Sequence, residues 1–223
     1  MSNAFNNINN MRTFIYIKQI WLLSIAFALV ACNSEQKLPV LPPDSAVLIL
    51  GDSLSYGTGA TKGEDYPTLL AQNTGWRIVN AGVPGDTTAQ GLARLPNLLL
   101  EHQPSLLIVE LGGNDFLKKV PIAQTENNLK AIIEQAKHNQ IMTLLIAIPD
   151  YQPAKAAFGG LSDHALYEKL SKETETPLIE EIFSEVLSNN ALKADYVHPN
   201  AVGYQQVETK LRASLIDLGL FKE

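Results

Sequence analysis

Short apolar runs alternate with longer segments of helical periodicity through most of the chain. The apolar runs predict strands at 46–50, 77–80, 106–111 and 142–148, and more weakly at 177–179. The periodic segments, in which leucine, isoleucine and valine recur every three or four residues, predict helices at 86–101, 125–138 and 200–218. Strands that alternate with helices are typical of βα units around a parallel sheet. The pattern therefore predicts a single α/β domain.

Residues that cap helices mark the start of two of these helices. Asp86 or Thr87 is suited to cap the first predicted helix. Thr125, with Asn128 three residues later, is suited to open the second.

The N-terminal segment has the order of features found in an export signal. Arg12 and Lys18 precede an apolar run from Ile20 to Ala31. The run is shorter than the ~20 residues that a membrane-spanning helix needs. It ends in Leu29-Val30-Ala31-Cys32, which resembles the lipobox of bacterial lipoprotein signal peptides, where the cysteine becomes the lipidated N-terminus after cleavage. An uncleaved anchor helix and a plain secretory peptide are the alternatives.

These features divide the chain into three parts. Residues 1–31 comprise Met1-Ser2-Asn3-Ala4, which resembles a cloning scar, and the signal peptide that follows it. Residues 32–43 comprise the lipidated Cys32 and a proline-containing tether, and residues 44–223 comprise the folded domain. We expect the mature protein to be a membrane-anchored bacterial lipoprotein that faces the periplasm or the cell exterior.

Composition narrows the functions open to this domain. The 223 residues, 46% of them hydrophobic, suffice for one α/β core and are too few for two substantial cores. A net charge of -6, without a cluster of Lys and Arg, argues against nucleic-acid binding. Because Cys32 is the only cysteine, an internal disulfide and a cysteine-based metal site are excluded.

Polar clusters follow three of the predicted strands. Gly51-Asp52-Ser53 ends the first strand, residues 80–86 follow the second, and Gly112-Gly113-Asn114-Asp115 follows the third. The carboxyl ends of parallel strands meet at one edge of a sheet, where ligands bind, so we expect these clusters to converge. The N–H groups of Gly85 and Ser53 and the Asn114 side chain then form a plausible oxyanion hole.

Far downstream, Asp195-Tyr196-Val197-His198 places a carboxylate three residues before an imidazole. Residues at this spacing are neighbours on a helix-like turn, so Asp195 can accept a hydrogen bond from one ring nitrogen of His198. The other ring nitrogen can then remove the proton of Ser53 and make it a nucleophile. Taken singly, Ser53 fits an ordinary turn and His198 an ordinary surface position. Their occurrence together with Asn114 and Asp195 favours a serine hydrolase.

Four sequence blocks together resemble the GDSL, or SGNH, hydrolase superfamily. They are Gly51-Asp52-Ser53-Leu54, Gly85-Asp86-Thr87, Gly112-Gly113-Asn114-Asp115 and Asp195-Tyr196-Val197-His198-Pro199-Asn200. Residues 80–96 and 109–129 more narrowly resemble the branch of bacterial acyl-CoA thioesterase I, lysophospholipase L1 and arylesterase. The resemblance covers the chain from Ala46 to Leu218.

The resemblance implies a three-layer, flavodoxin-like α/β fold with a central parallel five-stranded sheet. It also implies ester or thioester hydrolysis without a metal or a cofactor. Residue by residue, it implies that Ser53 is the nucleophile, His198 the base and Asp195 the residue that orients the base. Gly85 and Asn114 are implied as oxyanion donors.

We therefore expect a serine esterase that acts on lysophospholipids, short-to-medium acyl esters or aryl esters. An exported enzyme has no access to acyl-CoA, so thioester hydrolysis is expected only in vitro. One alternative is an O-acetyl esterase that acts on envelope carbohydrate, and another is a non-catalytic, lipid-binding surface lipoprotein. The expected partners are the small-molecule ester and, through Cys32, a membrane; nucleic acid is not expected, and a monomer is.

Two loops at the ends of predicted strands, 116–121 and 150–163, are expected to shape the acyl pocket. An acyl chain needs a groove lined by apolar side chains. The candidates are Phe116, Leu117, Val120, Tyr151, Phe158 and Leu161, and ordinary packing explains each one singly about as well.

Overall fold

The computed structural model describes residues 37–151, 154–155 and 159–222. The predicted signal peptide, Cys32 and Phe158 lie outside these residues. Leu38–Glu223 form one compact unit. In the part of the chain that is described, no helix is both long enough and apolar enough to cross a membrane.

Five parallel strands form one sheet in the order β2-β1-β3-β4-β5, which confirms the predicted α/β fold. Their bounds are Ala46–Gly51 (β1), Arg77–Gly82 (β2), Leu106–Glu110 (β3), Met142–Ile146 (β4) and Leu178–Ile179 (β5). β1 and β3 are buried along their whole length, which explains their nearly continuous apolar sequences. The winding reverses between β1 and β3, and ligands of such sheets bind at this switch point.

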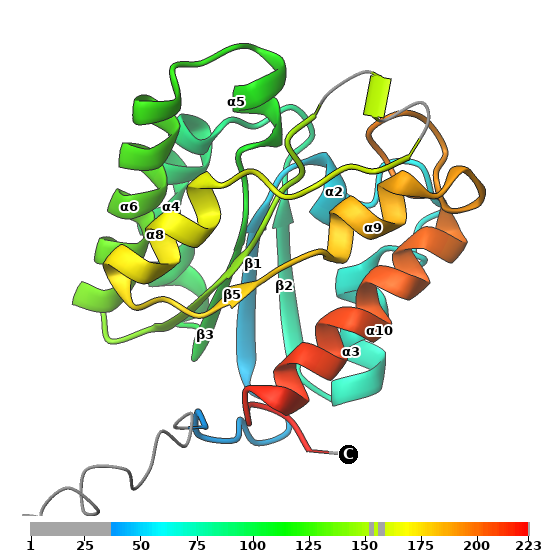
Figure 1. Cartoon of the computed structure of the whole chain (residues 1–223). Helices are drawn as coiled ribbons and strands as arrows, with labels where there is room; N and C mark the ends of the chain where they lie inside the picture. The colour runs from blue at the N-terminus through cyan, green and yellow to red at the C-terminus, as the bar shows by residue number, and fades with distance from the viewer. Residues whose placement is uncertain (1–36, 152–153, 156–158, 223) are drawn as a thin grey trace, which may run out of the picture. The chain divides into compact units, whose positions relative to one another are not determined.

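Helices cover both faces of the sheet, so the molecule has three layers (Figure 1). One face carries α4 (Thr88–His102), α6 (Ile122–His138) and α8 (Leu166–Thr174). The other carries α3 (Tyr66–Thr74), α9 (Ile182–Ser188) and α10 (Ala201–Asp217). The short helices α2 (Ser53–Tyr56) and α5 (Gly113–Leu117) directly follow β1 and β3, and the 3-10 turn η1 (Asn190–Leu192) precedes α10.

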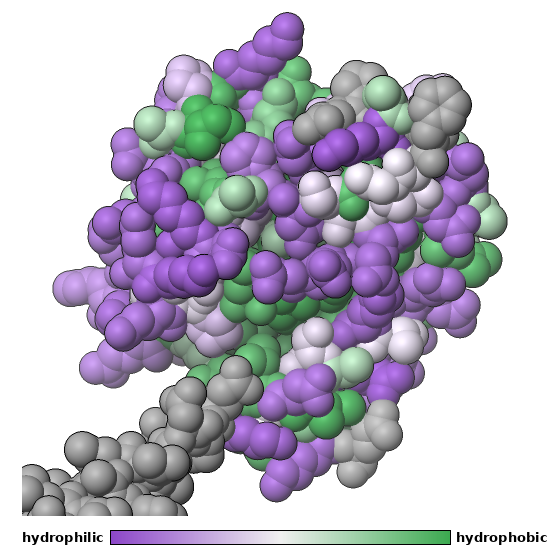
Figure 2. Space-filling model, in the orientation of Figure 1, coloured by the Kyte–Doolittle hydropathy of each residue, from purple (hydrophilic) through white to green (hydrophobic). Residues whose placement is uncertain are grey.

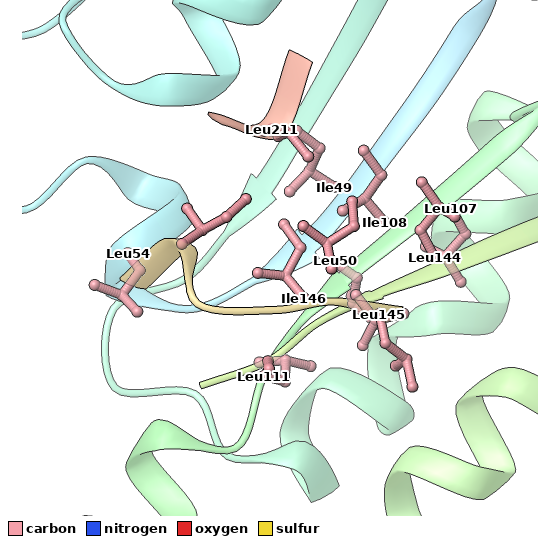
Figure 3. Packing of buried hydrophobic residues seen from close by; sticks show 14 of the residues in the cluster. Ile49, Leu50, Leu54, Leu107, Ile108, Leu111, Leu144, Leu145, Ile146 and Leu211 are labelled. Carbon is pink, nitrogen blue, oxygen red and sulfur yellow. The ribbon is translucent and has the colours of Figure 1, made fainter. Parts of the chain in front are cut away.

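The core lies between the sheet and these helices. Leu50, Ile108 and Leu145 are fully buried, and Figure 3 shows side chains of β1, β3 and β4 gathered in one cluster. Leu211 of α10 joins this cluster from one face of the sheet, and Ile132 of α6 belongs to it as well. Hydrophilic residues predominate over α6 and α8 on the face shown in Figure 2. Burial of this apolar surface is the main force that holds the layers together.

Residues 38–43, which were expected to belong to the tether, pack on the domain; we call them the N-terminal clip. The Leu38 N–H donates to the Leu218 carbonyl (2.8 Å), and the Leu41 N–H donates to the Leu220 carbonyl (2.9 Å). The Leu41 side chain is buried and belongs to the core. These contacts fix the clip against the C-terminal end of the domain, at the edge of the sheet where the strands begin (Figure 1).

Four predicted element boundaries are wrong by two or three residues. β2 ends at Gly82 rather than at 80, and α4 begins at Thr88 rather than at 86. β4 ends at Ile146 rather than at 148, and α6 begins at Ile122 rather than at Thr125. Pro121 occupies the N-cap position of α6. Thr125 is instead a buried residue inside the helix, so its capping chemistry is not used there.

Of the two residues predicted to cap α4, Thr87 occupies the N-cap position and Asp86 does not. Thr87 is the N-cap and forms a capping box with Gln90. Asp86 instead forms a salt bridge of 2.8 Å with Arg94. Asp86 is therefore tied to the body of α4 and does not cap its end.

Candidate active site

Ser53 opens the short helix that follows β1. Asp52 is the N-cap of α2, and its Oδ1 accepts the Leu54 N–H at 3.0 Å. Gly51 is required at the end of β1, because a Cβ there would lie 2.0 Å from Ser55 Oγ. The local sequence thus places the Ser53 hydroxyl at the switch point between β1 and β3.

His198 and Asp195 reach Ser53 from the loop between η1 and α10. Asp195 Oδ2 lies 2.8 Å from His198 Nδ1, and His198 Nε2 lies 3.0 Å from Ser53 Oγ. The backbone N–H groups of Val197 and His198 donate to Asp195 Oδ1 at 2.8 and 2.9 Å. This is an Asx turn rather than the predicted helix-like turn. It nevertheless brings the three predicted residues into one hydrogen-bonded chain.

The loop fixes the tautomer of His198. Partial burial opposes ionisation of Asp195, but the hydrogen bonds from His198 and Val197 outweigh it and lower the pKa of Asp195. Because a carboxylate only accepts hydrogen bonds, Nδ1 carries the ring proton and Nε2 turns a lone pair toward Ser53. An antiparallel bridge between Lys193 and Pro199 closes the loop. The imidazole is thereby held ready to accept the serine proton.

Gly85 and Asn114 line the same cavity as Ser53 and His198, as the converging strand ends predict. Gly85 has a φ of +84°, which favours glycine, and its carbonyl accepts a hydrogen bond from Lys118 Nζ at 2.7 Å. Asn114 lies in α5, directly after β3. These residues supply a backbone N–H and a side-chain amide next to the serine, which are the donors that an oxyanion needs.

The cavity beside Ser53 has a volume of about 260 Å³ and a largely apolar wall. Of the residues predicted for the acyl pocket, Leu117 and Tyr151 line it. Phe116 does not, because its ring stacks on the His164 ring with centroids 4.4 Å apart. Val120 and Leu161 are not in the wall either, and Phe158 lies outside the described residues. The rest of the apolar wall comes from Leu54, Pro84, Ile148, Pro149 and Val197.

Asp52 has a second contact that the sequence does not reveal. Its first contact is with the Leu54 N–H, as the N-cap of α2. In addition, Asp52 Oδ2 accepts a hydrogen bond of 2.8 Å from Asn114 Nδ2. Burial raises the pKa of Asp52 to about 6, although the hydrogen bonds from Leu54 and Asn114 oppose the shift.

Glu110, the last residue of β3, is a buried carboxyl group that sequence reasoning missed. Its Oε2 accepts the Ser55 N–H at 3.0 Å and the Ser55 hydroxyl at 2.6 Å, so it joins β3 to the helix that begins with Ser53. Burial and the neighbouring Asp52 charge raise the pKa of Glu110 well above its ordinary value. The available signal was a charged residue at the end of an otherwise apolar strand.

No cluster of His, Cys, Asp or Glu suited to a metal ion occurs in the described part of the chain.

The chain is similar to several known hydrolases. Residues 49–206 match the model of the GDSL-like lipase/acylhydrolase family. Thioesterase 1/protease 1/lysophospholipase L1 of Escherichia coli (strain K12) is 41% identical over 162 residues, which cover 69% of this chain and 75% of that protein. Esterase TesA of Pseudomonas aeruginosa is 33% identical over 189 residues, covering 80% and 88%. Among solved structures, the psychrotrophic esterase EstA from Pseudoalteromonas sp. has a TM-score of 0.68 and 27% identity, covering 78% of this chain and 98% of its own.

Proposed function

Because this chain belongs to the GDSL-like lipase/acylhydrolase family and is an ester hydrolase, we propose that it cleaves lysophospholipids and short-to-medium acyl esters through an acyl-enzyme on Ser53. The observation that carries the proposal is the hydrogen-bonded chain from Asp195 through His198 to Ser53, with links of 2.8 and 3.0 Å. Nucleophile, base and orienting carboxylate stand in the order that serine hydrolysis requires.

The reaction follows from the positions of these groups. His198 Nε2 takes the proton of Ser53 Oγ while Oγ attacks the carbonyl carbon of the ester. The negative charge that develops on the carbonyl oxygen is met by the N–H groups of Ser53 and Gly85 and by the Asn114 amide. His198 then gives its proton to the departing alcohol, which leaves an acyl group on Ser53. Water, deprotonated by His198, then attacks the acyl carbon. The bond between this carbon and Ser53 Oγ breaks, the acid leaves, and His198 returns the proton to Ser53 Oγ.

The apolar wall of the cavity supports the proposal that the enzyme binds the acyl chain of its substrate. Leu117 of α5, together with Ile148 and Tyr151 after β4, offers apolar surface beside Ser53. Apolar surface removed from water contributes about 25 cal/mol per Å² to binding before the entropy of ordering is subtracted. The names of the relatives, a lysophospholipase and esterases, agree with this substrate class.

Hydrolysis of a p-nitrophenyl ester series from acetate to laurate tests the proposal. We expect the wild-type protein to release p-nitrophenol and Ser53→Ala to lose about 10⁴-fold or more in kcat. Ser105→Ala is the matched control, because Ser105 is exposed and precedes β3 at the opposite edge of the sheet. A peak at acetate alone would favour the O-acetyl esterase. A background that Ser53→Ala leaves unchanged would favour the non-catalytic lipid-binding protein.

We also propose that the enzyme is an exported lipoprotein held on a bacterial membrane by lipid on Cys32, facing the periplasm or the cell exterior. The lipobox-like Leu29-Val30-Ala31-Cys32 supports this location. The position of the N-terminal clip is compatible with it, because the chain enters the domain at the sheet edge opposite Ser53 (Figure 1). An anchor at that edge leaves the active site open to substrate.

A further inference from the structure

The Asn114 side-chain amide donates a hydrogen bond to the carboxylate of Asp52, which takes no part in the mechanism above. Asp52 is 2% exposed, and its two oxygens have different partners: Oδ1 accepts the Leu54 N–H, and Oδ2 accepts Asn114 Nδ2 at 2.8 Å. We infer that Asp52 is a positioning residue for the oxyanion hole, which fixes the direction of the Asn114 amide and so determines which of its atoms the oxyanion meets. This inference rests on the proposed function.

The two ends of an amide differ in chemistry, and a carboxylate distinguishes them. The Asn114 nitrogen carries two N–H groups, whereas its oxygen only accepts hydrogen bonds. A carboxylate cannot donate, so Asp52 selects the rotamer in which Asn114 Nδ2 faces it. One N–H is bonded to Asp52, and the second N–H of the same nitrogen is left for the oxyanion. The donor is thus oriented before substrate arrives, which is the condition for electrostatic stabilisation of a transition state.

Replacement of Asp52 by asparagine should reverse this orientation. The Leu54 N–H still needs an acceptor, so the asparagine oxygen would take the Oδ1 position and its NH₂ group the Oδ2 position. That NH₂ group faces Asn114 Nδ2, and two donors repel each other. Asn114 therefore turns and accepts with its oxygen, which moves its N–H groups away from the oxyanion. A substitution that nearly preserves shape is then as harmful as removal of Asn114.

The charges around Asp52 make this orientation dependent on pH. Burial raises the pKa of Asp52 to about 6; His198 opposes the shift, and Asp86, from the loop before α4, adds to it. Glu110 of β3 is electrostatically linked to Asp52, and so are Tyr66 of α3, Tyr167 of α8 and Tyr204 of α10. Arg94 of α4 donates hydrogen bonds to Asp86 and to the carbonyl of Gly51, the residue before Asp52. As the pH falls through this pKa, Asp52 gains a proton and can donate as well as accept, so its preference for one Asn114 orientation weakens.

Steady-state kinetics of the purified full-length protein on p-nitrophenyl butyrate test the inference. We expect Asp52→Asn and Asn114→Ala each to lower kcat by about 10²- to 10³-fold, with KM changed less than about threefold. Asp52→Ser keeps a cap but is too short to reach Asn114, so it should lose only about tenfold. The double variant Asp52→Asn/Asn114→Ala should be no worse than Asn114→Ala, because Asp52 acts only through Asn114.

A matched control and a pH profile separate positioning from folding. Asp115, the next residue after Asn114, is buried and accepts the Thr88 N–H and hydroxyl at 2.8 and 2.6 Å. Asp115→Asn should lower the unfolding temperature while kcat stays within about threefold of the wild-type value. The acid limb of kcat against pH should be steeper in the wild-type protein than in Asn114→Ala, in which protonation of Asp52 no longer affects an oxyanion donor.

The outcomes distinguish this inference from the function on which it rests. A wild-type protein without esterase activity, or an active Ser53→Ala variant, overturns the proposed function and the inference with it. If Ser53→Ala is inactive but Asp52→Asn keeps the wild-type kcat, the function stands and the inference is wrong. Losses that multiply in the double variant also overturn it, and so does an acid limb that is identical in wild type and Asn114→Ala.

Discussion

At the scale of single residues, the carboxyl group of Asp52 stabilises the catalytic geometry and destabilises the fold. Its pKa is about 6 in the folded protein, compared with 3.8 for an ordinary aspartate. A folded state that holds a proton more tightly than the unfolded chain becomes less stable as the pH rises through this interval. The difference of about 2 pH units corresponds to a cost on the order of 3 kcal/mol above pH 6.

Asp52→Asn should therefore stabilise the protein at alkaline pH. We expect its free energy of unfolding to exceed that of the wild type by up to about 3 kcal/mol at pH 8, and the gain to vanish near pH 3.5. Urea unfolding at both pH values measures the difference. An equal difference at the two pH values would mean that ionisation of Asp52 is not its cause. The same variant is expected to lose activity, so stability and activity change in opposite directions.

At the scale of elements, the junction between β3 and α5 depends on one glycine. Gly112 has a φ of +129°, and a Cβ there would lie 2.2 Å from the hydroxyl of Tyr167. That hydroxyl donates to the Leu111 carbonyl at 2.8 Å and so ties α8 to the end of β3. The position of Asn114, two residues after Gly112, depends on this contact between α8 and the strand end.

A comparison of alanine substitutions at Gly112 and Gly63 distinguishes the effect of the Tyr167 contact from the effect of backbone strain. Gly63→Ala is the control, because Gly63 also has a positive φ (+94°) but nothing lies within 4 Å of its Cβ position. We expect Gly63→Ala to lose about 1–2 kcal/mol of stability from strain alone. Gly112→Ala should lose more, and its kcat should fall because Asn114 moves. Equal losses of stability in the two variants, measured by urea unfolding, would contradict a role for the Tyr167 contact.

The sequence predicts the central elements better than the peripheral ones. The strands at β1 and β3 were predictable because burial on both faces leaves an almost uninterrupted apolar run. Helices α3, α8 and α9 were not predicted, since seven to nine residues hold too few turns for a clear helical period. The start of α6 was misplaced because Thr125 resembles a cap but is buried inside the helix.

For the site, the sequence predicts which residues come together but not every bond between them. The five predicted residues carry recognisable chemistry in four blocks, and the parallel sheet gathers the strand ends. The bond from Asn114 to Asp52 depends on the relative placement of α2 and α5, which no local pattern specifies. The same holds for Glu110, whose partner Ser55 lies 55 positions earlier in the chain.

At the scale of the whole molecule, the N-terminal clip and the candidate active site lie at opposite edges of the sheet. β1 connects the two edges, and its six residues span about 20 Å. A lipid anchor before the clip would therefore hold the domain by the edge that does no chemistry. This arrangement predicts that membrane attachment and catalysis are separable.

Cys32→Ser tests this separation. We expect the wild-type protein to fractionate with membranes and the variant to be soluble, because the variant lacks the thiol that carries the lipid. The kcat on a water-soluble ester should be the same for both, since Cys32 precedes the clip, which joins the domain at the edge of the sheet opposite the candidate active site. A variant that still fractionates with membranes would contradict lipidation at Cys32.

The clip also determines how mechanical load enters the domain. Tension on a tether lipidated at Cys32 would reach the fold first at the Leu38 and Leu41 hydrogen bonds, whose acceptors are the carbonyls of Leu218 and Leu220 after α10. These bonds would be pulled before β1, so the load would be shared with the C-terminal segment. The clip would therefore take such a load first, and the hydrogen bond between His198 and Ser53 at the far edge would lie away from the point where the force enters.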